Sequence, residues 1–101
     1  MNIKIEKPAP ERLEELKVKT WPTLEKEACT INWYFDQIEE SYFLEGRIIV
    51  VTEDGQEVEV KKGDLAVFSK GLRCTWYIKK PMRKHFMFNK RSAFDSYISF
   101  C

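Results

Sequence analysis

The residues of this chain that could do chemistry lie mostly in its second half. The only histidine, His85, ends the run Arg83-Lys84-His85, which places three hydrogen-bond donors in succession on one predicted strand. Such donors suit a ligand that carries a carboxylate or an amide. Glu39 adds a carboxylate and Cys74 a thiol. These residue types predict a site for a small polar molecule.

The thiol of Cys74 has two interpretations. In an apolar interior a thiol is an inert small hydrophobe, because burial raises its pKa and suppresses the reactive thiolate. Alternatively, Cys74 and His85 form a nucleophile and base, which also requires an oxyanion site that the sequence does not supply. Arg73 does not activate the thiol, since neighbours on a strand point to opposite faces. With Cys29 and Cys101 the chain has three cysteines and no CxxC pair, so we expect reduced thiols.

Length and charge narrow the class of protein. The 101 residues fit one domain, and Lys plus Arg number 17 against 16 Asp plus Glu. A net charge of +1 gives no field that would recruit a nucleic acid or an anionic membrane. No stretch approaches the roughly 18 apolar residues that span a bilayer, and the charged residues 1–7 lack the apolar core of a secretory signal. We expect a cytoplasmic protein with no nucleic-acid or membrane partner.

The elements that must position these side chains are mostly strands. Residues 10–16 predict one short helix, because a proline stands first and two leucines follow three apart. From residue 29 onward, short runs of aromatic and β-branched residues alternate with turn signals, which is typical of a sandwich or barrel. Strands are predicted near 2–6, 29–36, 39–45, 47–53, 56–62, 65–69, 73–79 and 83–89.

Turns and the chain end complete this prediction. Asp54-Gly55 predicts a hairpin between residues 47–53 and 56–62, since glycine supplies the positive φ of a tight turn. Pro81 lacks an amide hydrogen and predicts a turn between the last two strands. The tail is predicted to cover one barrel end or to complete a dimer, because it carries apolar residues at partly helical spacing: Phe94, Tyr97, Ile98 and Phe100.

Several segments together resemble a known family: 3–8, 21–22, 32–36, 42–46, 62–65, 69–76 and 83–86. On these segments the chain resembles a single-domain cupin, an RmlC-like jelly roll, and more narrowly the small proteins related to the cupin half of ureidoglycine aminohydrolases. The resemblance implies an all-β, antiparallel jelly-roll barrel that fills one domain over 1–101, with a core barrel at about 29–89 and a C-terminal extension at 90–101.

The same resemblance implies where metal ligands would stand. A metal-binding cupin presents two histidines, a glutamate about five residues later and a third histidine in its second motif. Glu39 fills the glutamate position, but the first two histidine positions fall on Asn32 and Tyr34, or one step later on Trp33 and Phe35. Cys74 replaces the third. No metal is therefore expected; if Mn, Zn, Fe or Ni were bound, its ligands would be Glu39, Cys74 and His85.

The functional prediction is a cupin that binds a small polar molecule in its barrel through a degenerate metal site. In this hypothesis Glu39 accepts a hydrogen bond from an amine or amide, and Lys84 and His85 donate to an acid group. Aromatic side chains supply the walls. The predicted binding residues are Asn32, Tyr34, Glu39, Cys74, Trp76, Lys84 and His85.

Two alternatives come from other classes. The first is a metal-dependent enzyme that acts on a small ureido or amino compound, as the resemblance to ureidoglycine aminohydrolases implies. The second is a non-catalytic assembly protein with a filled barrel, a homodimer joined through a sheet edge and the tail. Whether the chain catalyses a reaction stays open at this point.

Overall fold

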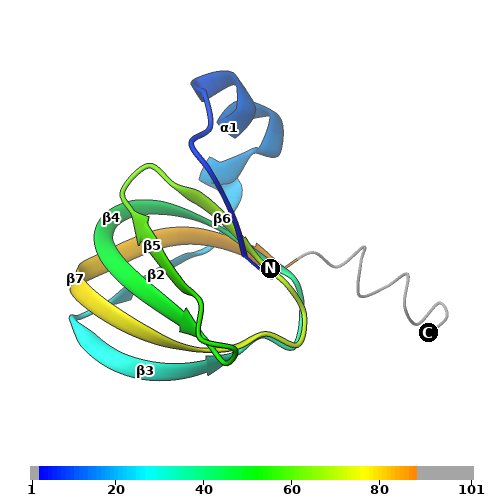
Figure 1. The fold of residues 1–101 in the computed structure, drawn as a ribbon. Helices are drawn as coiled ribbons and strands as arrows, with labels where there is room; N and C mark the ends of the chain where they lie inside the picture. Colours follow the sequence, from blue (N-terminus) through cyan, green and yellow to red (C-terminus); the bar gives the residue numbers. More distant parts are fainter. Residues whose placement is uncertain (1–2, 89–101) are drawn as a thin grey trace, which may run out of the picture.

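One antiparallel sheet of seven strands makes up most of the structure, a computed structural model that describes residues 3–88. Figure 1 shows this sheet curling round its interior, with the short helix outside it. The elements in chain order are β1 (Ile3–Glu6), α1 (Pro10–Leu16), the 3₁₀ turn η1 (Val18–Thr20), β2 (Thr23–Lys26), β3 (Cys29–Tyr34), β4 (Glu39–Thr52), β5 (Glu57–Lys61), β6 (Leu65–Phe68) and β7 (Arg73–Phe88).

Two long strands, β4 and β7, form the centre of the sheet. The strand order is β1-β6-β4-β7-β2, and the free lengths of β4 and β7 pair with β5 and β3. Every pairing is antiparallel. At one end of the barrel β4 pairs with β6 and β7 pairs with β2. At the other end β4 pairs with β5 and β7 pairs with β3. The predicted all-β antiparallel jelly roll is confirmed.

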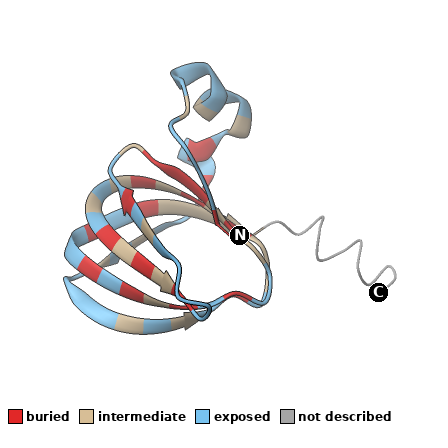
Figure 2. Ribbon diagram, in the orientation of Figure 1, coloured by how far each residue is buried: buried red, intermediate tan, exposed pale blue. Residues whose placement is uncertain are grey.

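Side chains alternate between the inside and the outside of the sheet, as a period of two requires. Along the first half of β7, Cys74, Trp76 and Ile78 are buried while Arg73 and Tyr77 are exposed, and Figure 2 shows the same banding on the other strands. The interior is apolar and contains a cluster of aromatic rings: Trp33, Phe35, Phe43, Phe68 and Trp76. A charge turned inward therefore enters a medium of low polarity.

The long strands correct three predictions. The segments predicted as 39–45 and 47–53 form the single strand β4, Glu39–Thr52, and the segments predicted as 73–79 and 83–89 form the single strand β7, described as Arg73–Phe88. Pro81 lies within β7 rather than in a turn. The sheet accommodates it through three register shifts between β4 and β7, around Gly46 and Pro81. Gly46 has a φ of 112°, and a Cβ there would lie 2.7 Å from the Cβ of Met82, so the two chains approach closely at this bulge.

Helix α1 occupies the residues predicted for it, but β2 was not predicted. Its sequence, Thr-Leu-Glu-Lys, has one apolar residue, which is too weak a pattern to indicate a strand. It forms because β7 offers it a partner between Met82 and His85. The predicted tail, 90–101, lies outside the described residues. Within 3–88, no helix has the length and apolar character needed to cross a membrane.

Candidate functional site

A charged pair lies inside the barrel. The Lys84 ammonium donates to Glu39 Oε2 at 2.6 Å and to Ser41 Oγ at 3.2 Å, and Ser41 Oγ donates to the same carboxylate oxygen at 2.6 Å. Lys84 is 1% exposed and Glu39 is 3% exposed. Alternation explains the arrangement. Glu39 and Ser41 are two residues apart on β4, so their side chains share a face, and the neighbouring strand β7 presents Lys84 to that face. The barrel therefore holds a fixed cation beside a fixed anion.

Aromatic rings surround this pair. The Lys84 Nζ atom lies 4.8 Å from the ring centre of Trp76 and 5.6 Å from that of Phe43. Phe86, two residues further along β7, lies at 6.0 Å and is only half-buried, as is Phe88. A cation over an aromatic face is attracted by the negative charge of that face. Lys84 thus has two oxygen acceptors and an aromatic wall.

Burial changes the proton affinity of Lys84. Loss of hydration lowers the pKa of its ammonium below the usual range, and the charge and hydrogen bond of Glu39 oppose that shift only in part. Glu39 Oε2 accepts hydrogen bonds from both Lys84 and Ser41, while Oε1 has no hydrogen-bond partner within residues 3–88. The pair therefore retains one acceptor atom for a further donor.

Cys74 and Trp76 also lie inside the barrel, two residues apart on the same face of β7. The Trp76 indole nitrogen donates to Cys74 Sγ at 3.3 Å. Burial raises the pKa of the Cys74 thiol, and the bond from Trp76 counteracts this only in part. The ring of His85 lies against the Trp21 carbonyl oxygen and not beside the thiol. The structural interpretation of Cys74 therefore fits better than a nucleophilic one.

His85 faces away from the barrel interior, contrary to the predicted site. It follows Lys84 on β7, and adjacent residues of a strand point to opposite faces. Its ring Nδ1 lies 3.0 Å from the carbonyl oxygen of Trp21, outside the sheet near α1 and η1. Because the side chain of Lys84 points inward, the ring of His85 lies on the opposite face of β7 and cannot contact Glu39.

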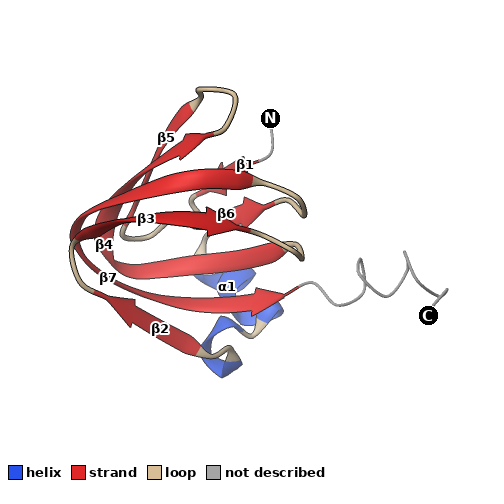
Figure 3. Ribbon diagram, turned by 90° about the horizontal axis from the view of Figure 1, so that it is seen from below, coloured by secondary structure: helices blue, strands red, loops and turns tan. Residues whose placement is uncertain are grey.

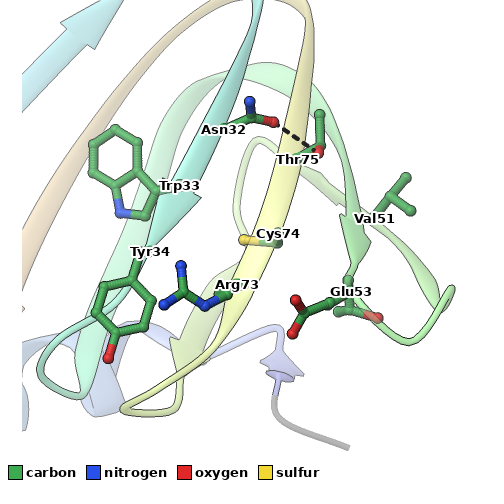
Figure 4. A pocket seen from close by; sticks show the side chains of 9 residues that line it. Asn32, Trp33, Tyr34, Val51, Glu53, Arg73, Cys74 and Thr75 are labelled. Carbon is green, nitrogen blue, oxygen red and sulfur yellow. Dashed lines mark hydrogen bonds between the residues drawn. The ribbon is translucent and has the colours of Figure 1, made fainter.

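Asn32 and Tyr34 also face outward, which corrects the prediction that Tyr34 lines the barrel cavity with Asn32 at its edge. Tyr34 is 49% exposed and lies under the guanidinium of Arg73, whose carbon is 4.5 Å from the ring centre. Asn32 accepts a hydrogen bond from the Thr75 hydroxyl at 3.1 Å. Figure 4 shows these pairs at an open surface depression of about 390 Å³. Ile31 and Trp33 of β3 face inward, as does Phe35 just after the strand, so the chain takes the second of the two registers that the sequence left open.

The positions of Glu39, Cys74 and His85 decide whether these residues could bind a metal ion together. A site for zinc, manganese or iron needs at least three good donors. Within residues 3–88 no group of three or more His, Cys, Asp or Glu side chains is placed to share an ion. The combination of Glu39, Cys74 and His85 is therefore not assembled. Instead, the ammonium of Lys84 lies against the retained carboxylate of Glu39.

Sequence reasoning missed Ser41 and the pairing of Lys84 with Glu39. Ser41 could have been found, since it shares a face with Glu39 on the same strand. The partner of Glu39 could not, because it comes from a residue 45 positions away.

Comparison with known proteins identifies similar sequences and folds. The model of the EutQ-like cupin domain family matches residues 13–86. The crystal structure of a DUF861 family protein from Thermotoga maritima is 51% identical, with a TM-score of 0.84, over 85% of this chain and 98% of that one. No curated protein matches.

More distant structures share the fold alone. The Clostridium difficile EutQ protein is 20% identical with a TM-score of 0.60, over 65% of this chain and 52% of that one. A putative ethanolamine utilization protein Q from Salmonella typhimurium is 21% identical with a TM-score of 0.59, over 65% and 53%. This chain thus spans about half the length of those two proteins.

Proposed function

Because the chain belongs to the EutQ-like cupin domain family, whose fold encloses a barrel interior, we propose that it binds a small polar molecule there without a metal ion. The observation that carries the proposal is the buried Lys84–Glu39 ion pair. Replacing a buried ion pair by apolar residues is often neutral or stabilising, so stability alone does not account for its presence. A role in recognition does.

The atoms of the pair define the class of ligand. Glu39 Oε1 is a spare acceptor for an amine, amide or ureido N–H. The Lys84 ammonium can turn one N–H from Ser41 to a ligand carboxylate or carbonyl. Phe86 and Phe88 are half-buried further along β7, and the ring centre of Phe86 lies 6.0 Å from the Lys84 Nζ atom, so an aromatic face is near the cation. These groups suit a small molecule with an acid and an amide-like group, such as an N-carbamoyl amino acid. The resemblance to ureidoglycine aminohydrolases supports the same class.

The enzyme alternative has less support. It requires a divalent ion to activate water, and within residues 3–88 no two further donors join Glu39 to hold one. No reaction is proposed.

The test is ligand-dependent stability, with N-carbamoylglycine as the probe and glycine and acetate as fragments. A ligand at a hundredfold excess over its Kd adds about 2.7 kcal/mol of unfolding free energy, which for a domain of this size raises Tm by roughly 10 °C or more. We expect stabilisation by N-carbamoylglycine and none by manganese, zinc, iron or nickel salts. The control is Glu39→Gln/Lys84→Met, which removes both charges together and leaves no charge unpaired.

Two outcomes oppose the proposal. Stabilisation of the double variant equal to that of the natural chain would place the ligand elsewhere. Stoichiometric metal in protein purified without chelator, lost on Glu39→Gln, would favour the enzyme.

A further inference from the structure

A second cavity lies outside the barrel, between the helical segment and the outer face of the sheet. It has a volume of about 550 Å³, within the range of small-molecule sites. Figure 3 shows α1 on the outer side of the sheet, near β2 and β7. Its apolar lining comes from Leu13, Val18, Tyr42 and Leu44. It shares no lining residue with the depression at Tyr34 and does not include the Lys84–Glu39 pair.

The cavity wall is held by packing and hydrogen bonds. Val18 and Trp21 are buried against Leu65, with Leu13 and Tyr42 packed on them. Two bonds to the carbonyl oxygen of residue 17, from the amide and the hydroxyl of Thr20, fix the 3₁₀ turn. The cavity is thus formed before a ligand arrives, which lowers the entropic cost of binding.

His85 supplies one oriented polar atom. Its Nδ1 faces the Trp21 carbonyl at 3.0 Å, and a carbonyl oxygen only accepts, so Nδ1 carries the proton. In the neutral ring Nε2 is then an acceptor. Since His85 lines the cavity, this lone pair is available to an N–H or O–H donor there. No hydrogen bond from residues 3–88 occupies it.

The rim is cationic. Lys17 and Lys19 line the cavity together with one acid, Glu14. None of the three forms an ion pair within residues 3–88. Lys17 holds a left-handed backbone, with φ 57° and ψ 43°, which few residues other than glycine adopt. The local balance is one positive charge, which favours an anionic group at the rim.

We propose that this cavity binds a small amphipathic acid, with an apolar ring, a carboxylate that meets the lysines and an N–H or O–H donor that meets His85 Nε2. The site is independent of the one inside the barrel. The apolar lining would pack against the ring of the ligand. The net positive charge of the rim would attract its carboxylate, and the fixed tautomer of His85 would accept a hydrogen bond from its N–H or O–H group.

Three aromatic probes separate these features. Indole-3-acetate has ring, carboxylate and N–H; 1-naphthylacetate lacks the N–H; tryptamine replaces the carboxylate by an ammonium. We expect indole-3-acetate to bind most tightly by calorimetry with the full chain. Amide shifts in NMR spectra should map to residues 13–20, 42–44 and 85.

Variants then identify which side chains of the protein contact the probe. In His85→Asn the side-chain amide can still donate to the Trp21 carbonyl but presents no acceptor at the Nε2 position. One hydrogen bond is worth about 1 kcal/mol, so indole-3-acetate should weaken about fivefold while 1-naphthylacetate is unchanged. Lys17→Gly/Lys19→Gln, which tolerates the left-handed backbone, should reduce the preference for indole-3-acetate over tryptamine. Lys79→Gln, a charge removed elsewhere on β7, should alter neither.

Other results overturn the proposal. Equal affinities for indole-3-acetate and tryptamine would show that the rim does not select an acid. Shifts confined to barrel residues would place the probes with the interior site. Absence of binding by the full chain, with binding restored by removing residues 89–101, would make the tail of this chain the occupant. Because Glu39→Gln/Lys84→Met leaves this cavity intact, failure here is distinguishable from failure of the barrel site.

Discussion

Lys84 and Glu39 stabilise each other inside an apolar barrel, and each charge is tolerable there because the other is present. Moving a lone charge from water into a protein interior costs several kcal/mol. The 2.6 Å contact and the Ser41 hydroxyl offset much of that cost. Because both partners are almost fully buried, solvent screens the pair little. The pair should therefore behave as a unit, unlike an ion pair on the surface.

This coupling predicts a non-additive double-mutant cycle. Lys84→Met alone leaves a buried carboxylate and should lower the unfolding free energy by about 3–5 kcal/mol, and Glu39→Gln alone should act similarly. The double variant should recover most of that loss, as measured by urea unfolding followed by tryptophan fluorescence. Arg83→Met, which removes the exposed ion pair with Glu45, is the control and should change stability by less than about 1 kcal/mol. A double variant as unstable as the sum of the singles would contradict the coupling.

Side-chain direction limited what the sequence could predict at this scale. The residue types of the site were identifiable, but a shift of one residue in register sends every side chain to the other face. Two registers were open for β3. Trp33 and Phe35 take the interior because they bury more apolar surface than Asn32 and Tyr34 would. The same alternation gives the inward place on β7 to Lys84 and the outward place to His85.

The bulge between β4 and β7 is the least regular part of the sheet. It keeps both long strands continuous past Gly46 and Pro81, which the sequence predicted to be breaks. Glycine and proline indicate where a strand is irregular, but the pattern alone does not tell a bulge from a turn. Composition and alternation did suffice for β3, β5 and β6. The four-residue β2, with its single leucine, depends on pairing with β7 and has no signal of its own.

The close approach at this bulge predicts a large effect of Gly46→Ala. The new Cβ would meet Met82 at 2.7 Å, and the φ of 112° disfavours any residue with a Cβ. Backbone strain of about 1–2 kcal/mol and overpacking of about 1–3 kcal/mol together should lower stability by about 2–5 kcal/mol. Differential scanning calorimetry measures the fall in Tm. Gly55→Ala is the matched control, since its φ is 90° and no atom lies within 4 Å, so only the backbone strain applies. Equal losses in the two variants would rule out the steric contact.

At the scale of the whole molecule, the single predicted site separates into three places. The barrel interior holds Glu39 and Lys84, an outer surface of the sheet holds Asn32 and Tyr34, and the helix side holds His85. The fold itself was predictable because alternation, turn residues and the resemblance all indicated one architecture. Pairing between strands that are distant in the sequence decides which side chains of the curled sheet lie together. A single sequence does not specify that pairing.

The comparison with the Thermotoga maritima protein bears on how much of the chain the fold needs. That protein is matched over 98% of its length by 85% of this chain, so the shared fold does not require all 101 residues. Residues 3–88 by themselves supply two apolar clusters. We therefore predict that a chain of residues 1–88 unfolds in one cooperative transition, with a Tm within about 5 °C of the full chain, equivalent to roughly 1 kcal/mol.

Measuring the mass of both chains in solution decides what the tail contributes. The sequence predicted that the tail either covers one barrel end or completes a homodimer through its apolar residues Phe94, Tyr97, Ile98 and Phe100, and the second alternative can be tested. If the tail completes a homodimer, the full chain should be a dimer and residues 1–88 a monomer with the same cooperative unfolding, because assembly and fold would then depend on different residues. An unchanged dimer would assign the interface to the sheet. Loss of cooperative unfolding on truncation would contradict the inference that residues 3–88 contain the whole core.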